Sequence, residues 1–350
     1  MTYKIPVSEP SIGELEKKYV AEVMESGWIS SQGPMVKRFE EEFAKKMGAK
    51  YGIAVSSGTN ALQLAVEALH LSPGDEVLVP DFTMIASAWA VQDAGAKPVF
   101  VDCDDDLNID VTEIEEHITN KTKAIMPVHI YGRQCNMKAI REIAYEYGLR
   151  IIEDSCEAHG IQLEGDMACY SLFANKIVSS GEGGIVVTND KYFAEQIRHL
   201  RGMAFNYAHT FHHKKKAHNF RFTAIQAAIA LAQTERLNEI LEKRKLIEKW
   251  YDEGLAHIPQ VELMPKRDVL WMYDVLAEDR DGLVRRLESE GIETRVFFRP
   301  MTMQPMYKVE PHKETMGSRY FRSGLYLPTF TDISEEEVKV VCKAIKNYYA

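Results

Sequence analysis

The sequence has few cysteines, no long apolar run and no excess of positive charge. Its five cysteines are scattered and form no CxxC pair, which excludes a zinc site and a disulfide framework as organising features. No stretch approaches the ~20 apolar residues that a membrane span needs. The opening residues, MTYKIPVSEP, also lack the apolar stretch of a secretory signal. We therefore expect a cytoplasmic protein with no membrane partner.

The charge balance argues against a nucleic-acid partner. Forty-two Lys and Arg residues face fifty-two Asp and Glu residues, which gives a net charge of −10. A basic cluster, HHKKK at residues 212–216, is explained by a solvated loop. A hydrophobic fraction of 45% over 350 residues is typical of a folded chain, and this length predicts more than one domain.

Apolar strand-like runs alternate with helix-like segments over the first two thirds of the chain. The pattern predicts strands at residues 51–57, 76–80, 97–102, 123–132, 149–155, 169–173 and 183–190. It predicts helices at residues 61–70, 85–95, 112–118 and 137–148. Continuous Val/Ile-rich strands separated by helices are typical of an α/β fold with a mostly parallel sheet covered on both faces.

The character of the sequence changes near residue 235, where a long charged amphipathic helix begins. Shorter elements follow it to the end of the chain. We therefore predict a large domain over residues 1–240 and a smaller C-terminal α/β domain over residues 241–350. The N-terminal segment is expected to pack partly on the smaller domain.

A hydroxyl-rich turn lies between the first strand and the first helix of this pattern. Ser56-Ser57-Gly58-Thr59-Asn60 would place backbone N–H groups, a helix dipole and hydroxyls around a phosphate. A plain helix N-cap explains the same residues.

Two further polar residues stand out against apolar surroundings. Asp154 ends an apolar strand, where a carboxylate needs a cationic or hydrogen-bonding partner. A helix cap or a buried ion pair would also explain it. Lys176 lies in a loop between two apolar strands, where desolvation favours the neutral amine that forms Schiff bases. The alternative is a surface salt bridge to Glu182.

These three features together point to one ligand. A phosphate anchor, a carboxylate for a ring nitrogen and an amine for an aldehyde are the parts that a protein supplies to pyridoxal 5′-phosphate. The 22 residues from Asp154 to Lys176 (176 − 154) leave room to cross between two strands.

The chain resembles the DegT/DnrJ/EryC1/StrS family of sugar-nucleotide aminotransferases, which have the fold-type I, aspartate aminotransferase-like architecture. The matching segments occur in family order along most of the chain: GWISSQGPMVKRFEEEFA, AVSSGTNALQLAV, GDEVLVPDFTMIASAWAV, AGAKPVFVD, MPVHIYG, IIEDSCEAHG, SLFANKIVSSGEGGIVVTND, HNFRFTAIQAAIALAQTERL, ETRVFFRPMTMQPMY and LYLPTF.

The resemblance implies a role for each matching residue. Lys176 corresponds to the Schiff-base lysine and proton carrier, Asp154 to the partner of the pyridine nitrogen, and Glu157 to the residue near the ring hydroxyl. The implied phosphate ligands are Ser57, Gly58, Thr59 and Ser171, with Asn219 contributed by the neighbouring subunit of a homodimer.

The chain departs from the family pattern at three places. Met84 replaces an aromatic residue that often stacks on the cofactor ring, and a thioether covers a ring face less rigidly. Thr302 stands where relatives often carry a histidine, and residues 160–169 form a shorter segment than expected. All three bear on the sugar pocket rather than on the cofactor chemistry.

The implied reaction passes the amino group of L-glutamate to a 4-keto-6-deoxy sugar nucleotide. The expected product is a 4-amino-4,6-dideoxy sugar, with viosamine slightly preferred to perosamine. The alternatives are amination at C3 of a 3-keto sugar nucleotide and a catalytically silent binding or regulatory protein. A related dehydratase branch carries histidine in place of the lysine, and Lys176 argues against it.

Overall fold

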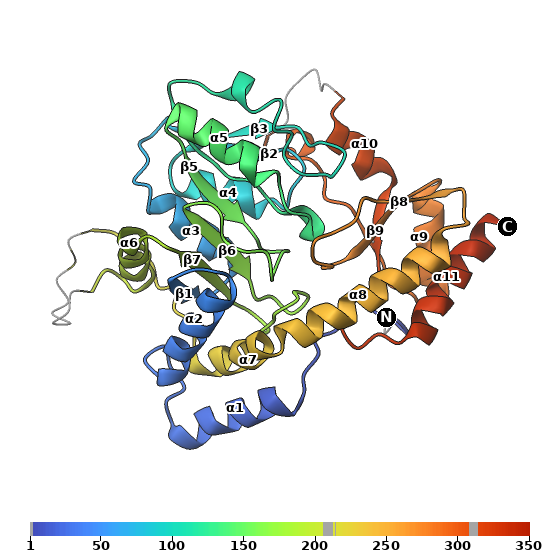
Figure 1. The fold of residues 1–350 in the computed structure, drawn as a ribbon, viewed down its shortest axis with the longest axis horizontal. Coiled ribbons are helices and arrows are strands. Elements are labelled where there is room, and N and C mark those ends of the chain that lie inside the picture. Colours follow the sequence, from blue (N-terminus) through green and yellow to red (C-terminus); the bar gives the residue numbers. More distant parts are fainter. Residues whose placement is uncertain (1–2, 206–212, 214, 308–313) are drawn as a thin grey trace.

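The larger of two sheets has seven strands and is mostly parallel (Figure 1). The structure is a computed structural model that describes residues 3–205, 213, 215–307 and 314–350. In spatial order the strands are β1 (Tyr51–Val55), β7 (Gly184–Thr188), β6 (Met167–Ser171), β5 (Arg150–Asp154), β4 (Thr122–Ile125), β2 (Glu76–Pro80) and β3 (Lys97–Val101). Among these pairings β7 is antiparallel to both of its neighbours, β1 and β6, and the other pairs are parallel. The predicted mostly parallel α/β sheet is confirmed.

Helices cover both faces of this sheet because its strands are apolar on both sides. One face packs against α3 (Gly58–Glu67), α4 (Ala86–Asp93) and α6 (Lys191–Arg201). The other packs against α2 (Pro34–Lys46), α5 (Met137–Tyr147) and α7 (Ala224–Glu235). Gly148 ends α5 with a φ of 65°, a left-handed conformation that glycine adopts without strain.

Two predicted elements are shorter than expected. The helix predicted over residues 112–118 is a single 3-10 turn, η1 (Glu115–His117), because one short turn does not repay the cost of helix nucleation. The strand predicted over residues 123–132 ends with β4 at Ile125, before Pro127, which has no N–H to continue the ladder. A second 3-10 turn, η2 (Ile130–Gly132), follows it.

The smaller sheet is antiparallel and belongs to the C-terminal third of the chain. Its strands, in spatial order, are β10 (Arg295–Val296), β11 (Gly324–Leu327), β9 (Tyr273–Ala277) and β8 (Val261–Leu263). Helices α9 (Arg280–Ser289) and α11 (Glu335–Tyr349) share its hydrophobic core. The remaining elements here are η3 (Met301–Met303) and α10 (Met316–Ser323).

Helix α8 (Leu237–Leu255) follows α7 closely and runs from the larger sheet to the smaller one (Figure 1). The proposed boundary at residue 240 lies in its first turn and stays a prediction. The chain start lies beside the smaller sheet, since Ile5 bridges to Ile292, whereas α1 (Glu14–Ser26) and α2 pack on α7. None of the described helices is long and apolar enough to cross a membrane.

A buried charge network ties the smaller sheet to the larger one. Arg133, which follows η2, lies 2.9 Å from a carboxylate oxygen of Asp274 on β9. Arg267 donates its Nε–H to the same carboxylate over 2.6 Å and pairs with Glu248 at 3.0 Å. The carboxylate of Asp274 is fully buried between the two guanidinium groups. A buried charge of this kind depends on its partners.

Asp274→Asn should therefore destabilise the fold by about 3–5 kcal/mol, because it leaves two buried guanidinium groups without their shared carboxylate. Urea unfolding followed by circular dichroism measures the loss. Glu41→Gln is the control, because it breaks an exposed helical pair with Lys37 and should cost less than about 1 kcal/mol. Equal losses in the two variants would contradict the role given to the network.

Candidate active site

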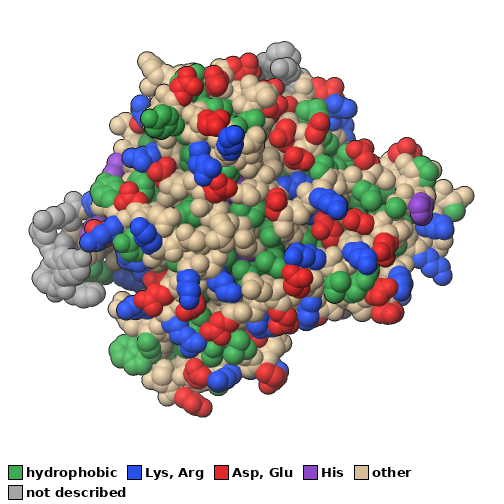
Figure 2. Space-filling view, in the orientation of Figure 1, with side chains coloured by type: hydrophobic (Ala, Val, Ile, Leu, Met, Phe, Trp, Pro, Cys, Tyr) green, Lys and Arg blue, Asp and Glu red, His purple; other side chains and the backbone are tan. Residues whose placement is uncertain are grey.

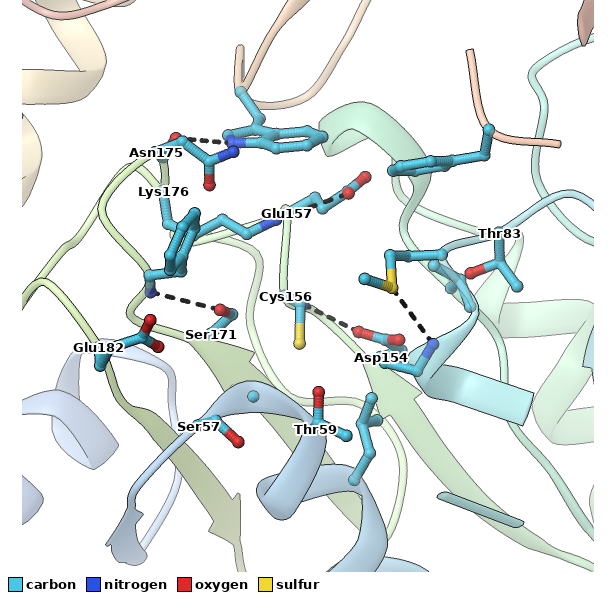
Figure 3. A pocket seen from close by; sticks show the side chains of 18 of the residues that line it. Ser57, Thr59, Thr83, Asp154, Cys156, Glu157, Ser171, Asn175, Lys176 and Glu182 are labelled. Atoms are coloured by element: carbon cyan, nitrogen blue, oxygen red, sulfur yellow. Dashed lines mark hydrogen bonds and ion pairs between the residues drawn. The ribbon is translucent and has the colours of Figure 1, made fainter. Parts of the chain in front are cut away.

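A cavity of about 360 Å³ opens at the carboxyl ends of β1, β5 and β6, where α/β sheets bind their ligands. Residues from both sheets line it (Figure 3): Ser57, Gly58, Thr59, Leu62, Thr83, Met84, Ala86, Val128, Asp154, Cys156, Glu157, Ser171, Phe173, Asn175, Lys176, Glu182, Trp271, Phe298 and Tyr326. The cavity brings together every residue of the sequence-predicted site except Asn219.

The hydroxyl-rich turn forms one wall of the cavity. Ser57 is the N-cap of α3 and accepts a hydrogen bond from the backbone N–H of Asn60 at 3.1 Å. Ser57 therefore acts as a helix N-cap, which was the other interpretation of this turn. Ser57, Gly58 and Thr59 nevertheless also line the cavity. A Cβ at Gly58 would lie 2.7 Å from the Cβ of Ser171, so the turn sits directly against the end of β6. An anion here would meet the first amides of α3 and two hydroxyl side chains.

Asp154 is fixed at the end of β5 by two hydrogen bonds. Ser87 of α4 donates its hydroxyl to one carboxylate oxygen over 2.7 Å, and the backbone N–H of Cys156 donates to the other over 3.1 Å. The preceding residue, Glu153, faces His129 and the backbone of Gly165 instead. The alternation expected along a strand thus leaves only Asp154 in the cavity.

Lys176 enters the cavity from the loop between β6 and β7, and its side chain is 11% exposed. Its Nζ lies 3.6 Å from a carboxylate oxygen of Glu157, and Figure 3 shows the two side chains pointing toward each other. The sequence also allowed a surface salt bridge to Glu182, but the carboxylate that pairs with this lysine in the structure is that of Glu157. Its amine is therefore directed into the cavity and not toward solvent.

Glu157 has an unusual environment for a carboxylic acid. Burial raises its pKa to about 7, against the lowering effects of Lys176 and of the backbone N–H of Tyr131, which donates to it over 2.9 Å. A group of this kind exchanges a proton near neutral pH.

Several residues in the cavity or next to it were not predicted from the sequence. Thr83 and Ser87 are buried hydroxyls 3.1 Å apart, and their four-residue spacing in TMIAS is the pattern that could have drawn attention to them. Trp271, Phe298 and Tyr326 come from the C-terminal third and had no local pattern. Met84 lines the cavity and is 48% exposed, and its contact with a cofactor ring stays a prediction.

Asn219 and Thr302, which the sequence analysis also named, do not line this cavity. Asn219 is exposed and accepts a hydrogen bond from Arg221 at 2.9 Å, outside the cavity of its own chain. A contact with a neighbouring subunit stays a prediction. Thr302 holds η3 to the end of β2 through its hydroxyl, which donates to Asp81 over 2.9 Å.

His212 and Lys214 of the basic cluster lie outside the described residues. On the face shown in Figure 2, basic and acidic side chains are interspersed.

The residues present fit pyridoxal 5′-phosphate. A largely buried amine, a carboxylate held by two hydrogen bonds and a hydroxyl-lined helix start surround one cavity, and the wall between them is apolar at Leu62, Ala86 and Val128. These are the contacts that an aldehyde, a ring nitrogen, a phosphate and a flat ring require.

Comparison with known proteins identifies relatives along the whole chain. Residues 10–346 match the DegT/DnrJ/EryC1/StrS aminotransferase family. The GDP-perosamine synthase of Escherichia coli O157:H7 is 40% identical, over 99% of this chain and 99% of its own. The GDP-perosamine synthase of Caulobacter vibrioides is also 40% identical, over 98% of this chain and 97% of its own.

A dTDP-3-amino-3,4,6-trideoxy-alpha-D-glucose transaminase of Streptomyces venezuelae is 34% identical, over 94% of this chain and 90% of its own. The crystal structure of S. venezuelae DesV superposes with a TM-score of 0.91 at 32% identity, over 99% of both chains.

The titration of Glu157 provides a test of the site. Its side-chain carboxyl should titrate near pH 7, because burial disfavours the charged form. Infrared or ¹³C measurements on glutamate-labelled protein, with Glu157→Gln to identify the signal, will show it. Because the folded-state pKa is raised, this group's contribution to stability is present at low pH and is lost as pH rises toward 7. Titration near the ordinary value of glutamate would contradict the burial argument.

Proposed function

Because this chain belongs to the DegT/DnrJ/EryC1/StrS aminotransferase family, we propose that it transfers the amino group of L-glutamate to a keto sugar nucleotide. The observation that carries the proposal is the single cavity where Lys176, Asp154 and the Ser57–Thr59 turn converge. The named relatives that aminate sugar nucleotides support the substrate class.

Pyridoxal 5′-phosphate is the proposed cofactor, and when bound it supplies an electron sink that stabilises negative charge on the carbon that exchanges the amino group. Ser57, Gly58, Thr59 and Ser171 would hold its phosphate. Asp154 would face its ring nitrogen, and the two hydrogen bonds from Ser87 and Cys156 keep that carboxylate in one orientation. Met84 would cover part of the ring.

Lys176 would anchor the cofactor through its amine and then act as the proton carrier. Its Nζ takes a proton from the amino-bearing carbon of glutamate and later delivers one to the sugar carbon that gains the amine. Glu157 keeps the lysine turned into the cavity and, with a pKa near 7, accepts a hydrogen bond when ionised and donates one when protonated.

The proposed assembly is a homodimer in which Asn219 reaches the phosphate of the neighbouring subunit. Asn219 is exposed and lies outside the cavity of its own chain, which is what such a contact requires. A closed two-fold dimer would build two equivalent sites from two chains.

The proposed position of amination is C4 of a 4-keto-6-deoxy sugar nucleotide. The two GDP-perosamine synthases at 40% identity support C4 and shift the preferred product from viosamine to perosamine. Amination at C3 remains the second candidate, because the S. venezuelae transaminase is 34% identical over most of its length. A catalytically silent regulator is disfavoured, since both Lys176 and Asp154 are in place.

The first half of the reaction has a spectroscopic test. Protein incubated with pyridoxal 5′-phosphate should show a visible absorption band that excess L-glutamate bleaches, and Lys176→Ala should lack this response, because it has no amine to bind the aldehyde. A band that glutamate leaves unchanged would contradict the proposed donor.

The same preparation distinguishes C4 from C3. After bleaching and removal of glutamate, GDP-4-keto-6-deoxymannose should restore the band and yield an amino sugar whose position is read by nuclear magnetic resonance. The 4-keto dTDP sugar and a 3-keto sugar nucleotide are the comparison substrates. Recovery of the band with the 3-keto compound alone would replace the C4 proposal by its alternative.

Mixing two impaired variants tests the shared site. Lys176→Ala and Asn219→Ala subunits should recover roughly one quarter of native activity when randomly re-associated, because half of the mixed dimer's sites then contain both residues. Lys176→Ala mixed with Asp154→Ala is the matched control and should recover none, since these residues line one cavity of the same chain. Equal recovery in both mixtures would contradict the contribution of Asn219 across the interface.

A further inference from the structure

The amine of Lys176 lies over the face of an aromatic ring that comes from the smaller sheet's part of the chain. Its Nζ is 3.8 Å from the centroid of the Trp271 indole, well within the range of a cation–π contact. Trp271 precedes β9, far from Lys176 in sequence, and both residues line the same cavity.

The indole of Trp271 is held in place by a hydrogen bond and by neighbouring aromatic rings. Its Nε1–H donates to the backbone carbonyl of Asn175 over 2.9 Å, so the ring is tied to the peptide unit that immediately precedes Lys176. The backbone carbonyl of Trp271 accepts a hydrogen bond from the buried Arg244 at 2.8 Å. The ring packs near those of Tyr131 and Tyr326, and the residue is 2% exposed. Such a ring is already oriented before Lys176 contacts it.

A lysine this deeply buried needs compensation for its positive charge. The nearest carboxylate, Glu157, supplies only part of it near neutrality, because its own pKa is about 7 and it is then partly protonated. Burial keeps two other neighbours neutral, since it lowers the pKa of His159 to about 3 and raises that of Cys156 well above its usual range. The other titratable groups around the cavity are Asp154, Glu182 and Tyr326.

The face of an indole attracts a cation through its quadrupole, and this attraction does not titrate. Trp271 therefore stabilises the positive charge of Lys176 whether or not Glu157 is protonated. The hydrogen bond to Asn175 also ties the ring to the loop that carries the lysine.

We propose that Trp271 is a positioning residue: its indole face holds the ammonium group of Lys176 in the cavity whenever Nζ is not bonded to the cofactor. This inference rests on the proposed function, in which the lysine must be free for part of each cycle and must deliver a proton to the sugar carbon that gains the amine. The residue acts through Lys176 and does not itself transfer a proton.

Fluorinated tryptophans at position 271 test the inference with almost no change of shape. Fluorine withdraws charge from the face of the indole, whereas the N–H remains able to donate to Asn175. In full-length cofactor-free protein at fixed pH, cyanate reacts only with the neutral amine of Lys176, and mass spectrometry of its peptide gives the rate. We expect the rate to rise steadily with the number of fluorines, by about two- to thirtyfold over the series, as the ammonium loses the ring face.

The matched control is the same series at Trp89, an exposed indole on α4 that bonds to Met306 and is not among the residues lining the cavity. Its fluorination should leave the labelling rate of Lys176 unchanged. A rate that is flat along the Trp271 series, or that rises equally along the Trp89 series, overturns the proposal.

The outcome is separable from that of the proposed function. The labelling rate needs neither cofactor nor substrate, whereas the aminotransferase proposal fails if glutamate does not bleach the visible band. A merely structural role for Trp271 predicts no dependence on fluorine number, because the shape of the ring and its hydrogen bond are retained.

Discussion

The ion pair between Lys176 and Glu157 inside a largely closed cavity is the interaction on which the arrangement of the site depends. A buried ammonium and a buried carboxylate are each costly alone, so the elements that carry them must be held at a fixed separation. Glu157 follows β5, and Lys176 follows β6, which is the parallel neighbour of β5 in the sheet. Parallel pairing brings the ends of these strands to the same edge and makes the pair possible.

The same constraint explains why the smaller sheet must be docked firmly on the larger one. Trp271, Phe298 and Tyr326 complete the cavity from the C-terminal third. The polar contacts that hold that part in place include the buried Arg133–Asp274 pair and the hydrogen bond from Thr302 to Asp81. Asp102 also accepts hydrogen bonds from the first amides of α10 at 2.7 and 3.2 Å. Each joins a strand end or loop of the larger sheet to the smaller part. Thr302, which stands where the family resemblance leads us to expect a histidine, therefore keeps a polar link between η3 and the end of β2.

Two acidic side chains of the cavity, Asp154 and Glu157, are both buried but are stabilised in different ways. Burial raises the pKa of Glu157 toward neutrality, and Lys176 and the amide of Tyr131 limit the rise. The carboxylate of Asp154 is stabilised differently, by two hydrogen bonds that hold its orientation. Two acids only three residues apart thus have different environments: hydrogen bonds hold Asp154 in one orientation, whereas Glu157 exchanges a proton near neutral pH.

The sequence by itself determined the sheet, most helices and the positions of Ser57, Asp154 and Lys176 on loops and strand ends, because local periodicity and the placement of polar residues after apolar strands carry that information. It overestimated the element at residues 112–118, where the apolar pattern was too short to support a helix. Only the tertiary structure decided that Lys176 pairs with Glu157 and not with Glu182, and that the face of an indole from the C-terminal third contacts its amine. Those contacts form only when parts of the chain that are distant in sequence pack against each other. Local sequence patterns therefore cannot predict them.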